Sequence, residues 1–115
     1  MKDVVQLIEC PRDAWQGKAE FIPAQTKIEY LQSLLQVGFH TLDAGSFVSP
    51  KAVPQLADTA AVLQALDLRD TSTKLLVILA NERGADQAAS LPFLAYWGYP
   101  LSVSEIFQHR NTNQS

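Results

Sequence analysis

The sequence has a single cysteine, and it lacks both long apolar runs and clusters of basic residues. One cysteine excludes an internal disulfide framework and fits a reducing cytoplasm. No uninterrupted apolar stretch reaches the roughly 18 residues that a membrane helix requires. Nine basic against twelve acidic residues give a net charge of -3, so nucleic acid is not an expected partner. The first residues carry no cleavage site of a secretory signal, and we expect a cytoplasmic protein.

Glycine-rich phosphate-binding motifs are absent as well. Neither GxGxxG nor GxxxxGK(S/T) occurs, and Gly45 and Gly84 stand alone. Their absence argues against a nucleotide-binding domain. What is present is a globular composition, with 47% apolar and 18% charged residues in a chain of 115. This composition supports one core in one domain and excludes a disordered chain.

Short apolar runs alternate with helical patterns along the chain. Strands are expected at residues 4–8, 39–42, 75–79 and 93–97, and the first of them is expected to be buried. Helices are expected from Pro23 to about Val37, after Pro50, and around residues 86–89. The connections are long enough for helical crossovers between parallel strands, so the alternation favours an α/β fold with a parallel sheet. Two closures remain open: a small doubly wound sheet, or part of a (β/α) barrel.

Polar and ionisable residues gather just past the expected carboxyl end of each strand. They are Glu9, Arg12 and Asp13; Asp43 and Ser46; Asn81 and Glu82; and Ser102, Ser104 and Glu105. This edge carries the ligand sites in both candidate architectures. Arg12 and Asp13 are the most informative pair, because a carboxylate can ligate a divalent cation while a guanidinium stabilises negative charge on oxygen. On spacing alone, an ordinary surface pair of arginine and aspartate remains the alternative.

Several motifs together resemble the 3-hydroxy-3-methylglutaryl-CoA lyase family. They are ECPRD at 9–13 with Gln16, SFVSPK at 46–51, VPQLAD at 53–58, and SVSEIF at 102–107 with RNTN at 110–113. The match runs almost from end to end of the chain. SFVSPK followed by VPQLAD is its most specific part.

The resemblance implies a parallel βαβαβαβ unit, the N-terminal half of a TIM (β/α)8 barrel. It also implies cleavage of 3-hydroxy-3-methylglutaryl-CoA to acetyl-CoA and acetoacetate with a divalent metal, Mg²⁺ or Mn²⁺. Carried over residue by residue, Asp13 would be a metal ligand and Arg12 would stabilise the enolate-like thioester oxygen. Gln16 and Ser46 would contact the substrate. Asp43 would be the second catalytic residue, at a position where the family has a glutamate.

The sequence also departs from the family pattern. Ala14 replaces a glycine, and Asp43 is one methylene shorter than the usual glutamate. The family's His-x-His pair and its metal-binding asparagine have no counterpart. We expect His40 to pack within a strand and His109 to be solvated. The family's catalytic cysteine comes from a later loop, so we expect Cys10 to be a small residue near the core.

A complete TIM barrel needs about 200–250 residues and eight strands. Residues 1–115 are therefore expected to form a partial barrel domain of four strands. We expect this piece alone to be inactive and to bind metal weakly, because one carboxylate falls short of an octahedral ligand set. The expected partners are an acyl-CoA substrate and, at the open strand edges, a second copy or a missing C-terminal half. Two alternatives stay open: a Claisen-type synthase of the same superfamily, and a non-catalytic half-barrel interaction domain.

Overall fold

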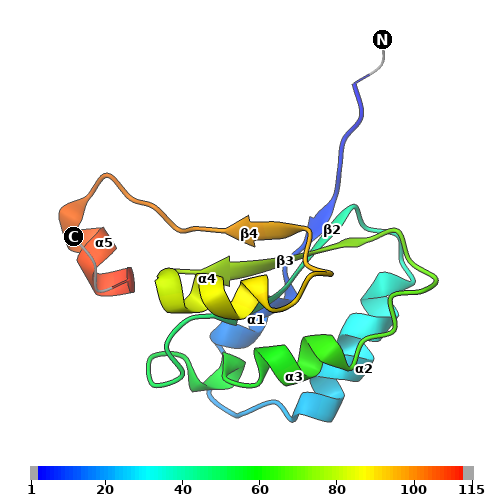
Figure 1. Ribbon diagram of the computed structural model, residues 1–115, viewed down its shortest axis with the longest axis horizontal. Helices are drawn as coiled ribbons and strands as arrows, with labels where there is room; N and C mark the ends of the chain where they lie inside the picture. The colour runs from blue at the N-terminus through cyan, green and yellow to red at the C-terminus, as the bar shows by residue number, and fades with distance from the viewer. Residues whose placement is uncertain (1–2, 113–115) are drawn as a thin grey trace.

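A computed structural model describes residues 3–112 of the chain, in which four strands and the helices between them form one α/β unit (Figure 1). The strands are β1 (Ile8–Glu9), β2 (Thr41–Phe47), β3 (Lys74–Leu79) and β4 (Tyr96–Gly98). The helices are α1 (Pro11–Gln16), α2 (Ala24–Leu35), the 3-10 turn η1 (Pro54–Leu56), α3 (Thr59–Gln64), α4 (Glu82–Ala89) and α5 (Glu105–Thr112). No helix within residues 3–112 is long and apolar enough to cross a membrane.

The sheet is parallel throughout and follows the order of the chain, β1-β2-β3-β4. On β3, Leu75, Val77 and Leu79 are buried, whereas Leu76 and Ile78 are partly exposed. This alternation shows that the helices cover one face of β3 and leave the other face open. The expected α/β fold with a parallel sheet is confirmed, and helices on one face favour a barrel segment over a doubly wound sheet.

The expected helix after Pro23 is confirmed as α2. Leu31 and Leu35 are buried on its inner face, at the helical spacing that the sequence predicts. Gly38 has a φ of +96°, which lets the chain leave the helix and turn into β2. The apolar run at 75–79 is likewise confirmed as β3, which begins one residue earlier, at Lys74.

Two strand predictions were wrong in their extent. Only Ile8–Glu9 pairs as a strand in the first run, and Val4 and Val5 are 82% and 84% exposed rather than buried. The cause is position, because β1 is an edge strand with a neighbour on one side only. The second strand continues to Phe47, so Asp43 and Ser46 lie within β2 instead of after it.

The C-terminal part contains a helix where none was expected from the sequence. Residues 105–112 form α5, and the expected strand at 93–97 is β4, which begins later and is shorter. The last residue of the RNTN motif at 110–113 lies outside the residues that the structure describes. Figure 1 shows α5 beyond the end of β4, joined to it by an extended segment.

Asn81 caps α4 at the carboxyl end of β3. Its side-chain Oδ1 accepts a hydrogen bond from the backbone N–H of Gly84 at 2.8 Å. We expect Asn81→Ala to lower the free energy of unfolding by about 1 kcal/mol, because a helix donor loses its partner. Asn81→Asp, which keeps an acceptor oxygen, is the matched control in urea unfolding. Equal losses in both variants would contradict the capping role.

Candidate active site

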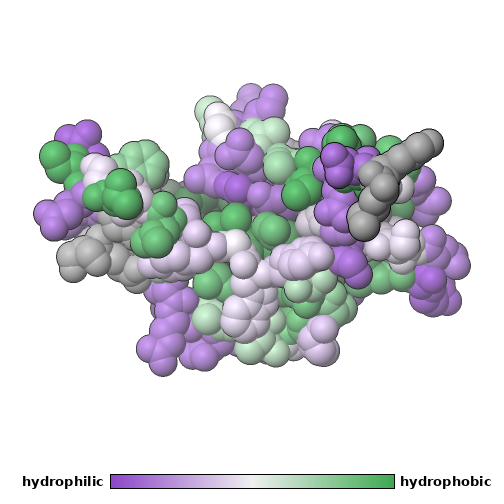
Figure 2. All heavy atoms as spheres, turned by 90° about the horizontal axis from the view of Figure 1, so that it is seen from above, coloured by the Kyte–Doolittle hydropathy of each residue, from purple (hydrophilic) through white to green (hydrophobic). Residues whose placement is uncertain are grey.

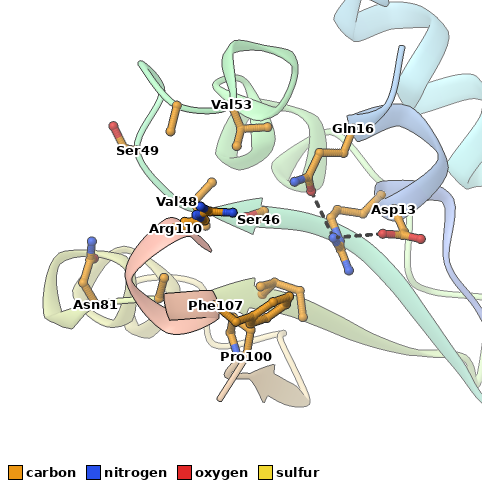
Figure 3. Close-up of a pocket in the computed structure, with 14 residues that line it drawn as sticks. Asp13, Gln16, Ser46, Val48, Ser49, Val53, Asn81, Pro100, Phe107 and Arg110 are labelled. Atoms are coloured by element: carbon orange, nitrogen blue, oxygen red, sulfur yellow. Dashed lines mark hydrogen bonds and ion pairs between the residues drawn. The ribbon is translucent and has the colours of Figure 1, made fainter. Parts of the chain in front are cut away.

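A cavity of about 530 Å³ opens at the carboxyl ends of the strands (Figure 3). Its wall includes Arg12 and Gln16 from α1, Ser46 from β2, Ile78 from β3 and Arg110 from α5. Ligand sites in parallel α/β folds lie at this end of the sheet. The cavity also falls within the size range of small-molecule sites, about 300–1,000 Å³.

Arg12 is held in the cavity wall by Asp43. Its Nη2 donates to Asp43 Oδ2 at 2.8 Å, and its Nε donates to Oδ1 at 3.2 Å, so the contact is bidentate. The two side chains are only 16% and 7% exposed. Gln16 Oε1 accepts a third hydrogen bond from Arg12 Nη1 at 3.0 Å, across one turn of α1. The guanidinium is therefore fixed in one orientation at the cavity.

The same contacts set the electrostatics of the site. Burial works against the charged form, but the hydrogen bonds and charge of Asp43 outweigh it and raise the pKa of Arg12 above its ordinary value. Arg12 is therefore a permanent cation. Asp43 does not line the cavity itself, and its geometry makes it the residue that positions Arg12.

Asp13 also lines the cavity, but its side chain is largely open to solvent. Its side chain is 77% exposed, and its Oδ1 is 3.6 Å from Arg12 Nη1 (Figure 3). An exposed carboxylate of this kind can serve as one ligand of a divalent cation. Within residues 3–112, however, no group of three or more histidine, cysteine, aspartate or glutamate residues could hold a metal ion. The described residues therefore do not make a metal site by themselves.

Ser46 reaches the cavity from a distorted part of β2. The register with β3 shifts between Asp43 and Gly45, and Ser46 is buried beyond the shift. A Cβ on Gly45 would overlap the Thr59 side chain, so α3 packs directly on the strand here. Thr59 Oγ1 in turn accepts a hydrogen bond from the Ser46 backbone N–H at 3.2 Å. Close packing of α3 thus fixes where Ser46 stands in the wall.

Cys10, His40 and His109 are not among the residues that line the cavity. Partial burial, followed by the charge of Asp43, raises the pKa of the Cys10 thiol, which stays protonated at neutral pH. Cys10 is nevertheless exposed, so its expected place near the core was wrong. His40 contacts Thr41 Oγ1 through Nδ1 at 2.7 Å and stacks on Tyr96, in agreement with a packing role.

The structure adds residues that sequence reasoning missed. Phe107 and Arg110 line the cavity from α5, and Figure 3 shows both away from Gln16 and Asp13 of α1. Only the resemblance of the 102–110 region to the lyase motifs could have indicated them. The cavity therefore carries two guanidinium groups, of which Arg12 alone was predicted.

This arrangement defines a class of protein. Parallel strands with helices on one face, and charged side chains at their carboxyl ends, are the layout of TIM-barrel enzymes. No family model matches the chain. Comparison with individual proteins is more specific.

Hydroxymethylglutaryl-CoA lyases match nearly the whole chain. The mitochondrial lyase of Arabidopsis thaliana is 39% identical over 110 residues, which are 95% of this chain and 23% of the relative. A lyase of Danio rerio named cytoplasmic is 37% identical over 96% of this chain and 33% of its own length.

Solved structures agree with these relatives. One is the structure of an HMG-CoA lyase from Acinetobacter baumannii in complex with coenzyme A and 3-methylmalate. It matches this chain with a TM-score of 0.90 at 29% identity, over 97% of this chain and 36% of the lyase chain. The Pseudomonas aeruginosa lyase has a TM-score of 0.84 at 32% identity, over 96% of this chain.

The chain is thus homologous to hydroxymethylglutaryl-CoA lyases, and the resemblance carried by its motifs is confirmed. Its α/β unit corresponds to part of their TIM barrel. It spans about a third of the length of the relatives that it matches. By length, it is therefore nearer a third of such a protein than a half.

Proposed function

We propose that this chain supplies the Arg12 side of the active site of a metal-dependent lyase that cleaves 3-hydroxy-3-methylglutaryl-CoA to acetyl-CoA and acetoacetate. The observation that carries the proposal is the buried, bidentate Arg12–Asp43 pair in the wall of the cavity. Homology to lyases over 95–96% of the chain supports it. Since the chain spans only about a third of those relatives, catalysis requires the remaining strands of the barrel.

The reaction needs a cation where Arg12 stands. Cleavage passes the proton of the C3 hydroxyl to a base, and the C3 carbonyl of acetoacetate forms as the C2–C3 bond breaks. The electron pair of that bond is left on the thioester as an enolate, which takes up one proton to become acetyl-CoA. Arg12 stabilises the negative oxygen of that enolate, and Asp43 and Gln16 keep the guanidinium aimed at it. Ser46 contacts the acyl group from the wall.

A divalent cation, Mg²⁺ or Mn²⁺, would polarise the substrate oxygens in the complete enzyme. Asp13 would supply one carboxylate oxygen to it, and the other ligands would come from residues beyond this chain. We place the complete protein in the cytoplasm, since the related lyase of Danio rerio is named cytoplasmic.

A substrate screen tests the proposal against a Claisen-type synthase. The chain is co-expressed with the C-terminal part of a homologous lyase and purified as a complex. We expect 3-hydroxy-3-methylglutaryl-CoA to be cleaved, and acetyl-CoA with 2-keto acids to remain unchanged. Condensation of acetyl-CoA with a keto acid, without cleavage of the first substrate, would overturn the lyase assignment.

A further inference from the structure

A network of buried polar side chains joins α2 to the loop between β2 and α3 (residues 48–58), which includes η1. Gln55 in η1 is 6% exposed, and Lys27 in α2 is 1% exposed. Lys27 Nζ donates to the backbone carbonyl of Gln55 and to Asp58 Oδ1, the latter at 2.7 Å. Burial of polar groups costs free energy unless hydrogen bonds compensate, so these contacts hold the loop in one position.

The side chain of Gln55 uses both ends of its amide. Its Oε1 accepts a hydrogen bond from the backbone N–H of Ile22 at 2.8 Å, and its Nε2 donates to the backbone carbonyl of Glu20 at 2.8 Å. Both partners belong to the loop between α1 and α2 (residues 17–23). Gln55 therefore fastens the α1–α2 loop to the β2–α3 loop.

These two loops border the candidate active site. Ala52 and Val53 of the β2–α3 loop line the main cavity, as does Gln16 at the end of α1. The same three residues, together with Lys18 and Gln55, line a smaller cavity of about 290 Å³ between the loops. Figure 3 shows Val53 and Gln16 on the same side of the main cavity. The separation of the two loops therefore sets the shape of this side.

The network is formed entirely by residues 20–58. Figure 2, which views the molecule from above, shows apolar side chains exposed across the middle and at the left end of that face. The network lies elsewhere, since it joins α2 to the segment before α3, and both helices lie at the bottom of Figure 1. Its contacts therefore need no part of a barrel beyond this chain.

We propose that Gln55 is a positioning residue for the acyl-CoA substrate. It holds the two loops at a fixed separation, and so it fixes the wall formed by Val53 and its neighbours without touching the reacting atoms. The inference rests on the proposed lyase function. Arg12 is held instead by Asp43 and Gln16, so its orientation does not depend on Gln55. Gln55 thus acts on substrate binding, whereas Arg12 acts on the chemical step.

Steady-state kinetics of the co-expressed complex with the C-terminal part of a homologous lyase provide the first test. Gln55→Met keeps the length of the side chain and removes both of its hydrogen bonds. We expect KM for 3-hydroxy-3-methylglutaryl-CoA to rise about tenfold while kcat stays within about threefold, because the change acts on binding and not on transition-state charge. Lys27→Met combined with Asp58→Leu releases the same loop from α2 and should raise KM in the same direction.

Two control variants separate positioning from stability. Thr73→Val removes a buried hydrogen bond at 2.7 Å to the carbonyl of Phe39, in contact with neither cavity, and should leave KM unchanged. Gln64→Met replaces an exposed glutamine of α3 and should change neither constant. Circular dichroism checks that all variants are folded.

Amide hydrogen exchange tests the loop contact without substrate. The Ile22 N–H loses its acceptor in Gln55→Met, so we expect its exchange to quicken about tenfold or more relative to that of Val77 in β3. Unchanged exchange at Ile22 would overturn the positioning role, whatever the reaction of the complex. Absence of cleavage by the unmodified complex would instead overturn the lyase assignment.

Three kinetic results would also contradict the role of Gln55. They are an unchanged KM in folded Gln55→Met, a loss confined to kcat, and an equal rise in KM in Thr73→Val. The second would place Gln55 in the chemical step, and the third would make the effect one of stability alone.

Discussion

Replacement of Arg12 by glutamine lowers kcat/KM of the reconstituted lyase by about 100- to 1,000-fold, on the account given above. Glutamine can donate a hydrogen bond to the enolate oxygen but carries no positive charge. Metal binding should change little, because the proposed ligand is Asp13. Its side chain is 77% exposed, and a single ion pair, at 3.6 Å, is its contact with Arg12. Measuring both kcat/KM and the amount of bound metal for the variant checks the two parts of the prediction.

Two control variants separate charge from folding. Arg69→Gln removes an exposed arginine that pairs with Asp67, and it should leave turnover unchanged. Arg12→Gln combined with Asp43→Asn removes the carboxylate that would otherwise be buried without its cation. This double variant should recover stability but not activity. If Arg12→Gln abolished metal binding and left the rate per bound metal intact, the role assigned to Arg12 would be wrong.

Replacement of Lys27 by methionine destabilises the chain by about 3–5 kcal/mol, the cost of leaving one partner of a buried ion pair alone. Lys27 is 1% exposed, and its Nζ donates to Asp58 Oδ1 at 2.7 Å and to the backbone carbonyl of Gln55. The Nζ also lies 4.5 Å from the centre of the Phe21 ring. These contacts tie α2 to the segment that forms one wall of the cavity, which includes Val53. Urea unfolding at fixed protein concentration measures the loss.

The exposed Lys18 provides the matched control. Lys18→Met should change the free energy of unfolding by no more than about 0.5 kcal/mol. The double variant Lys27→Met with Asp58→Leu should recover much of the loss, because it removes both buried charges. A single Lys27→Met that costs no more than Lys18→Met would show that the pair is not needed for stability.

Local patterns predicted the parts of the fold that depend on local physics. Leu31 and Leu35 recur at helical spacing, and α2 forms there. The run of residues around Val77 is short and wholly apolar, and it forms the strand β3. The site residues Arg12 and Ser46 were predicted because they follow or end strands whose carboxyl ends meet at one edge of the sheet, and both line the cavity.

The remainder depends on contacts between distant segments. A lysine is expected in solvent, yet Lys27 is buried because Asp58, 31 residues away, is folded against it. Asp43 was expected in a loop, yet it lies within β2, where Arg12 neutralises its buried charge. The apolar run from Val4 was expected to be buried, and it is exposed because no further strand in residues 3–112 covers it.

The most direct measurement is the release of acetoacetate from 3-hydroxy-3-methylglutaryl-CoA, with Mg²⁺ present, by three preparations. They are the 115-residue chain alone, the C-terminal part of a homologous lyase alone, and the two parts co-expressed. We predict no turnover by either part alone, and turnover by the complex that Arg12→Gln lowers by about 100- to 1,000-fold. Turnover by the chain alone, or a stable folded complex with no turnover, would contradict the account.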